Sequence, residues 1–140
     1  MRLARWVFAI AGIYGVLLMT PMYFTEARIA ATDPPAITHP EYYYGFIGVT
    51  LAWQLAFLLV ARDPVRYRPL MPIAVVEKLA FGVAGLVLFA EERARALIGT
   101  FAAIDLVFAA LFLLAFYLMR GTSWAHAHGA AGYSGATPTS

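Results

Sequence analysis

Four long apolar stretches, separated by short polar segments, dominate the pattern of hydrophobic and polar positions along the chain. They cover residues 3–24, 42–61, 70–90 and 97–119. Each stretch is long enough for an α-helix to cross the hydrocarbon core of a bilayer, which takes about 20 residues. The pattern therefore predicts an all-α fold, an integral membrane four-helix bundle over residues 1–120.

The last segment of the chain, residues 121–140, has a different character. It is a low-complexity run of Gly, Ala, Ser and Thr with two histidines. Such a composition buries too little apolar surface to form a core and is typical of a disordered tail. We therefore expect one transmembrane bundle followed by a low-complexity cytoplasmic tail.

Composition supports a membrane environment. Of the 140 residues, 62% are hydrophobic and only 13% are charged, which is too little charge to cover the exterior of a soluble domain. The absence of cysteine excludes disulfide scaffolds, iron–sulfur clusters and cysteine nucleophiles. The formal net charge of +2 comes from scattered residues with no basic block, so we expect no nucleic-acid partner.

The distribution of arginines predicts the orientation. One side of the predicted bundle carries Arg2, Arg5, Arg62, Arg66, Arg68 and Arg120, and the other carries Arg28, Arg93 and Arg95. Cytoplasmic loops are enriched in Lys and Arg. The bias predicts an N-in/C-in, multi-pass protein of a bacterial inner membrane. The aromatic residues Trp6, Tyr42, Tyr43, Tyr44, Tyr67 and Tyr117 fall near the predicted interfaces, where we expect them to act as anchors.

Small residues recur at helical spacing within the spans. Pairs three residues apart are Gly12/Gly15, Gly45/Gly48 and Gly82/Gly85, and pairs four apart are Ala11/Gly15, Gly48/Ala52 and Ala80/Ala84. Small side chains let helix backbones approach closely in lipid. We expect these faces to lie at helix–helix contacts.

Apart from Arg5 at the start of the first span, only three charged residues, Glu77, Lys78 and Asp105, lie within the spans. Charged groups at such depth are costly and face a bundle interior. At about 1.5 Å per residue, they lie near the same depth as Gln54, Thr50 and Tyr14 of the other helices. The sequence predicts a polar centre in an apolar cage, and these six residues are the candidate ligand-binding set.

Lys78 and Asp105 are predicted to pair, because a short loop makes their helices antiparallel neighbours. Two carboxylates then face one ammonium group, and Glu77 is expected to be the unpaired carboxylate. Three interpretations stay open: a structural cluster that sets helix register, a functional carboxyl whose burial favours its neutral form, or pairing with another subunit.

Metal and haem sites find little support in the sequence. His39, Glu41 and Asp33 are loop residues without ligand spacing, and His126 and His128 lie in the tail. We expect no metal, no catalytic residue set and no cofactor other than a bound lipid or quinone.

Three segments carry a distant resemblance to known proteins: Thr38-His39-Pro40-Glu41-Tyr42-Tyr43-Tyr44-Gly45, Ala61-Arg62-Asp63-Pro64-Val65-Arg66-Tyr67-Arg68-Pro69 and Glu77-Lys78-Leu79-Ala80-Phe81-Gly82. With the four-span plan, their order resembles small uncharacterised bacterial four-helix membrane proteins and, more distantly, the DoxX-like group. That resemblance implies an accessory subunit of a quinone-linked redox assembly. A second resemblance, to the EXPERA-type fold, implies intramembrane carboxylates that serve sterol-like ligands.

These observations favour a small non-enzymatic membrane protein, either an accessory subunit of a membrane assembly or a binder of a lipid-like or quinone-like ligand. Its partners would be the bilayer and a homo-oligomer or larger membrane complex. One alternative is an EXPERA-like enzyme acting on an isoprenoid or sterol-like substrate with Glu77 or Asp105 as acid/base. Another is a small proton-coupled transporter. A cavity reaching the carboxylates favours a ligand or an enzyme, and a solid core favours the accessory role.

Overall fold

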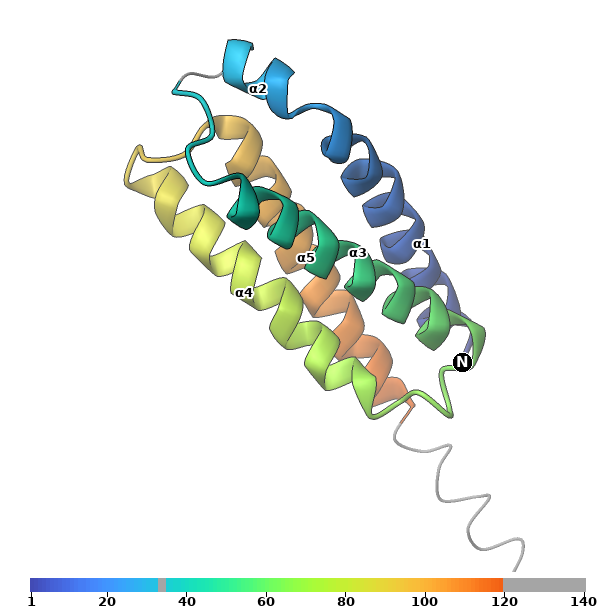
Figure 1. Ribbon diagram of the computed structural model, residues 1–140. Helices are drawn as coiled ribbons and strands as arrows, with labels where there is room; N and C mark the ends of the chain where they lie inside the picture. Colours follow the sequence, from blue (N-terminus) through green and yellow to red (C-terminus); the bar gives the residue numbers. More distant parts are fainter. Residues whose placement is uncertain (33–34, 120–140) are drawn as a thin grey trace, which may run out of the picture.

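The computed structural model describes residues 1–32 and 35–119, and every regular element within these ranges is a helix (Figure 1). In chain order the elements are α1 (Arg2–Met19), the 3₁₀ helix η1 (Thr20–Phe24), α2 (Glu26–Thr32), α3 (Pro40–Arg62), α4 (Leu70–Ala90) and α5 (Ala96–Leu118). The predicted tail at 121–140, Arg120 and the Asp33-Pro34 dipeptide lie outside the described residues. The all-α class is confirmed.

Four of these helical segments are long and apolar enough to cross a membrane: α1 continued by η1, α3, α4 and α5. Their bounds lie within two residues of those predicted from the hydrophobic pattern. Their outward faces carry exposed apolar side chains such as Leu17, which is 70% exposed, and Val76, which is 63% exposed. Faces of this composition are suited to lipid rather than water.

Prolines set several of the helix boundaries. Pro21 lies near the start of η1, where its missing N–H and its ring disfavour continuation of α1, so the backbone tightens into a 3₁₀ turn. Pro40 is the first residue of α3, a position that tolerates proline because its N–H needs no intrahelical partner. The positions of these two prolines therefore set the end of α1 and the start of α3.

The long helices form two antiparallel pairs, in which α1 packs along α3 and α4 packs along α5. The contacts between the pairs, α1 with α5 and α3 with α4, are less extensive. The N-terminus and the end of α5 lie at one end of the bundle, and α2 lies at the other (Figure 1). We call these the basic end, which carries Arg2, Arg62 and Arg66, and the α2 end.

Glycines allow the close approach within each pair. A Cβ atom on Gly82 would lie 2.7 Å from Leu106 Cδ2 of α5, and one on Gly12 would lie 2.8 Å from Leu58 Cδ2 of α3. The predicted role of the Gly12/Gly15 and Gly82/Gly85 faces is therefore confirmed.

Four of the other small residues, Gly45, Ala52, Ala80 and Ala84, do not lie at helix contacts, and the expectation for them was wrong. A Cβ atom on Gly45 would meet nothing within 4 Å. Ala52, Ala80 and Ala84 are exposed. Their spacing matches that of the buried glycines, but rotation of α3 and α4 within the bundle turns these positions outward.

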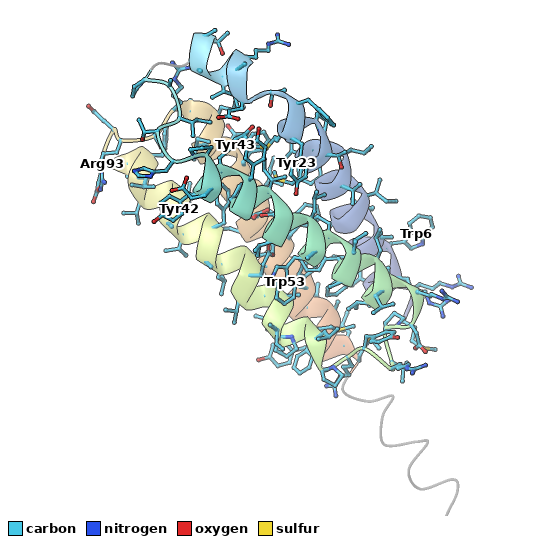
Figure 2. All side chains as sticks on the ribbon, in the orientation of Figure 1. Trp6, Tyr23, Tyr42, Tyr43, Trp53 and Arg93 are labelled. Atoms are coloured by element: carbon cyan, nitrogen blue, oxygen red, sulfur yellow. The ribbon has the colours of Figure 1, made fainter. Side chains whose placement is uncertain are left out.

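The short helix α2 was missed, because its charged residues and the following prolines read as a loop. It is tied to α3 by Tyr44, whose Oη donates to Glu26 Oε2 at 2.7 Å, and the preceding η1 is tied to α3 by Tyr43, whose Oη donates to the Met22 carbonyl at 2.7 Å. In Figure 2, Tyr23 and Tyr43 lie near each other toward the α2 end, whereas Trp6 points away from the bundle. The tyrosines at this end thus fasten the chain as well as lying near the predicted interface.

A layer of packed rings fills the half of the bundle toward the basic end. Phe8, Phe57 and Phe112 are each 0% exposed and come from α1, α3 and α5. The Phe8 and Phe112 rings stack with centroids 4.0 Å apart, and Phe57 meets Phe112 edge to face at 5.0 Å. Met71 of α4, also 0% exposed, belongs to the same cluster. All four long helices therefore contribute to one solid layer.

Candidate functional site

A pocket of about 480 Å³ occupies the interior in the half of the bundle toward the α2 end. Its walls are apolar side chains from α1, η1, α2, α3, α4 and α5, among them Leu18, Met22, Ile29, Phe46, Phe81, Leu97 and Phe101. The pocket forms where the two helix pairs make limited contact with each other. Its volume lies in the range typical of sites for small organic molecules, roughly 300–1,000 Å³.

Charged side chains gather at the floor of the pocket. Lys78 Nζ donates to both carboxylate oxygens of Asp105 at 3.2 Å each, across the contact between α4 and α5. The same Nζ lies 3.4 Å from Glu77 Oε2. The side chains of Lys78, Asp105 and Glu77 are 7%, 14% and 17% exposed. The prediction that Lys78 and Asp105 pair is confirmed.

Glu77 differs from the expectation. It was predicted to be unpaired, but it shares Lys78 with Asp105 through the 3.4 Å contact. This contact is an ion pair: Glu77 Oε2 is buried and has no hydrogen-bond partner of good geometry in the described ranges. The cause is position: Glu77 precedes Lys78 on α4, so the lysine reaches both carboxylates, yet only Asp105 lies where both lysine hydrogen bonds form.

Gln54 forms the part of the floor contributed by α3. It is 1% exposed, and its Nε2 donates to the Thr50 carbonyl at 3.1 Å. The rest of its amide lies against Gly15 of α1, where an added Cβ would collide with Gln54 Oε1. Gly15 therefore makes room for the one amide side chain that the described part of the chain contributes to the pocket.

Aromatic residues surround this polar floor. The Tyr14 ring lies 6.0 Å from the Phe108 ring, closing the α1–α5 side, and the Phe46 ring lies 6.2 Å from the Phe81 ring on the α3–α4 side. Below the floor, Lys78 Nζ lies over the Phe57 ring at 5.3 Å from its centroid. The charges therefore lie between the solid aromatic layer and the open pocket.

The structure brings all six candidate residues together. Glu77, Asp105, Lys78, Gln54, Tyr14 and Thr50 all line this one pocket. Their convergence follows from their common depth and helix faces. Sequence reasoning missed most of the apolar wall, including Met22, Ile29 and Leu97, because these residues have the same character as those that face lipid.

Metal-binding groups are not assembled here. Within residues 1–32 and 35–119, no three His, Asp or Glu side chains are grouped as they would be around an ion. His39 Nδ1 and Glu41 Oε1 lie 3.1 Å apart on an exposed surface, and Asp33, which was considered with them, lies outside the described residues.

The arrangement is suited to hold an amphipathic molecule, with apolar walls for its body and a few fixed polar groups for its head. The function of the chain is inferred below from the chemistry of the residues that line this pocket. Comparisons of this chain with protein-family models, with curated proteins and with solved structures found no match.

Proposed function

We propose that this chain is a membrane protein that binds a lipid-like or quinone-like molecule in the pocket between its helix pairs and carries out no reaction on it. The observation that carries the proposal is a pocket of about 480 Å³ with apolar walls that reaches Lys78, Glu77 and Asp105. Buried polar groups that only set helix register need no adjoining space. A pocket beside them favours a ligand over a purely structural role.

The proposed setting is a bacterial inner membrane, with both termini on the cytoplasmic side. Arg2, Arg5 and Arg62 are exposed at the basic end, and this end is richer in arginine than the α2 end. A cysteine replacing Arg66 should be labelled only from the cytoplasm, and one replacing Ala36 only from outside. The chain has no cysteine of its own, so each label reports one site, and the reverse pattern would contradict the orientation.

The ligand proposal is tested by filling the pocket. Leu18 lines the pocket, whereas its neighbour Leu17 faces outward. Leu18→Trp should abolish retention of a co-purified lipid or quinone in native mass spectrometry from nanodiscs, and Leu17→Trp should preserve it. Equal retention by both variants, or no small molecule retained by the unaltered protein, would contradict a ligand in this pocket.

A membrane enzyme of the EXPERA type is the second candidate, favoured by the presence of a carboxylate without a hydrogen bond at the pocket floor. In that case Glu77 would be the acid/base, because both oxygens of Asp105 are held by Lys78. Binding is the simpler proposal, since a general acid/base also needs a second group to act on the substrate. Conversion of a retained molecule, lost in Glu77→Gln, would establish the enzyme instead.

Two further roles receive less support. A proton-coupled transporter needs access from both sides, and the layer of Phe8, Phe57 and Phe112 fills the interior between the pocket and the basic end. An accessory subunit of a quinone-linked assembly, as the DoxX-like resemblance implies, is compatible with ligand binding. Co-purification of a second protein with the ligand would add that role to the proposal.

A further inference from the structure

We infer that the molecule bound in the pocket presents a hydrogen-bond donor, a neutral hydroxyl or an ammonium group, to the carboxylate of Glu77. This inference rests on the proposed function, because it specifies the head group of the ligand that the pocket would take. It follows from which donors and acceptors at the floor are already engaged.

Lys78, the one cation among the described residues that line the pocket, is already engaged. Lys78 Nζ lies within 3.4 Å of three carboxylate oxygens, two of Asp105 and one of Glu77. Its side chain is 7% exposed. An ammonium group has three hydrogens to donate, so a ligand carbonyl or anion would have to displace a carboxylate to reach it.

The acceptor capacity of the floor, in contrast, is in excess. Glu77 Oε2 meets Lys78 only as an ion pair and has no hydrogen-bond partner of good geometry within the described part of the chain. Oε2 is buried, whereas the side chain as a whole is 17% exposed and lines the pocket, so a ligand would approach the carboxylate through Oε1. A buried carboxylate without hydrogen bonds is costly, and a donor placed against it removes that cost.

The charges of the lining point the same way. With both carboxyl groups ionised, two carboxylates and one ammonium leave the floor with one negative charge in excess, and no arginine or histidine of the described residues lines the pocket. A carboxylate or phosphate head would add charge of the same sign at short range. Fatty acids and anionic phospholipid heads are therefore poor matches for this floor.

Neutral hydrogen-bond donors at the floor do not reverse this preference for a ligand head that donates a hydrogen bond. Gln54 uses one N–H on the Thr50 carbonyl, and the remaining groups are the hydroxyls of Tyr14 and Thr50, which also accept hydrogen bonds. Hydrogen bonds to a charged acceptor are stronger than those between neutral groups. Within a quinone–quinol pair, the quinol is consequently the form that fits.

The walls define where the body of the ligand lies. From Tyr14 at the floor, α1 and η1 line the pocket up to Met22, and Ile29 of α2 lines it farther along the chain. The distance from Tyr14 to Met22 is about 12 Å at the helical rise. An alkyl or isoprenoid chain of about ten carbons, directed toward the α2 end, matches this length.

The test uses four photoreactive probes with one alkyl diazirine chain and different heads: hydroxyl, ammonium, methyl ether and carboxylate. Each is added to the full-length protein in phosphatidylcholine nanodiscs, and labelled peptides are quantified by mass spectrometry. The variant is Glu77→Gln. The matched control is Glu92→Gln, in the exposed α4–α5 loop.

We expect the hydroxyl and ammonium probes to label pocket-lining peptides about tenfold more than the ether and carboxylate probes, as one hydrogen bond to a charged group allows. In Glu77→Gln the preference should fall to about threefold, because a neutral acceptor forms a hydrogen bond roughly half as strong. Glu92→Gln should keep the full preference. The ratio of ammonium to hydroxyl labelling distinguishes a charged head from a neutral one.

Three results would overturn the inference. Equal or stronger pocket labelling by the ether or carboxylate probe would refute the donor head while leaving a ligand pocket in place. A preference unchanged in Glu77→Gln would show that Glu77 does not recognise the head group of the ligand. Labelling confined to lipid-facing residues for all four probes would refute the pocket as a ligand site, and the proposed function with it. The comparison of probes on the unaltered protein stands even if Glu77→Gln fails to fold.

Discussion

The two halves of the bundle are built from the same apolar residue types, but they fill their interiors differently. Toward the basic end, Phe8, Phe57 and Phe112 pack in one layer and are each 0% exposed. Toward the α2 end, the same helices leave a pocket of about 480 Å³. Lys78 and its two carboxylates mark the boundary, since the lysine lies over the Phe57 ring on one side and lines the pocket on the other.

This difference separates the stabilising half of the fold from the half that contains the proposed binding pocket. In a bilayer, lipid tails are as apolar as the side chains, so helices associate through packing and polar contacts rather than through the hydrophobic effect. The ring layer supplies such packing, whereas the pocket gives up dispersion contacts along its walls. We therefore assign stability mainly to the packed half and the proposed ligand binding to the open half.

The largest effect should come from breaking the boundary itself. Lys78→Met leaves two buried carboxylates without their cation and should lower the free energy of unfolding by about 3–5 kcal/mol. Asp105→Leu should also destabilise, and the double variant should recover much of the loss because it retains only Glu77 as a buried charge. Unfolding in mixed micelles, analysed as a double-mutant cycle, measures the coupling.

Arg5→Met, at an exposed position of the basic end, is the control for Lys78→Met and should be nearly neutral. Two results would show that the ion cluster does not stabilise the fold: strictly additive losses in the cycle, or equal effects of Lys78→Met and Arg5→Met on the free energy of unfolding.

A second comparison sets the same substitution in the two halves. Phe112→Ala should cost about 3 kcal/mol, because it opens a cavity in a layer that is otherwise full. Phe101→Ala, in the wall of the pocket, should cost about 1 kcal/mol, because its ring already has open space on one side. If both variants lose equal stability in the same unfolding assay, the two halves do not differ in packing.

A smaller effect is expected where the floor of the pocket meets α1. A Cβ atom on Gly15 collides with the Gln54 amide, so Gly15→Ala should lower the unfolding free energy by about 2 kcal/mol. It should also push the amide toward the pocket and weaken retention of a bound molecule. Gly45→Ala adds the same methyl group where nothing lies within 4 Å, and it should change neither quantity appreciably. Thermal unfolding and native mass spectrometry of the two variants test this pair.

The smallest effect concerns the turn that joins α4 to α5 at the α2 end. Glu92 has a φ of 59°, the left-handed region that favours glycine. Glu92→Gly should raise the unfolding free energy by up to about 1 kcal/mol by relieving this conformation. Glu91 has an ordinary φ of −83°, so Glu91→Gly should bring no gain. A gain from both variants, or from neither, would show that this turn does not limit stability at the open end.

Much of the fold followed from local pattern because the bilayer restricts the alternatives. A chain crossing lipid must satisfy its backbone hydrogen bonds internally, so apolar stretches of sufficient length become helices. Helical periodicity also placed Lys78, Gly82 and Gly85 on one inward face, and all three are buried. The Lys78–Asp105 pair was predictable for the same reason, since antiparallel neighbours bring residues of similar depth together.

Pattern alone failed where a face or a contact depends on the rotation of a whole helix or on a side-chain conformation. Gly45 and Gly48 have the spacing of a contact face, but Gly45 meets no neighbour. Glu77 was expected to stand alone, yet it lies 3.4 Å from Lys78 Nζ. For Gly45 the missing neighbour depended on the rotation of α3, and for Glu77 the contact depended on the side-chain conformation of Lys78, its neighbour on α4.

The sequence by itself therefore determined the four apolar helices, the inward glycine faces and the set of polar residues at mid-depth. Only the tertiary structure decided that Phe8, Phe57 and Phe112 fill one half of the interior and that the other half stays open above Lys78. It also decided that α2 forms and is held to α3 by a tyrosine hydrogen bond. The physical reason is that periodicity specifies which side of a helix faces inward. The space left between helices depends on their separation and on the side-chain conformations that fill it, which no local pattern encodes.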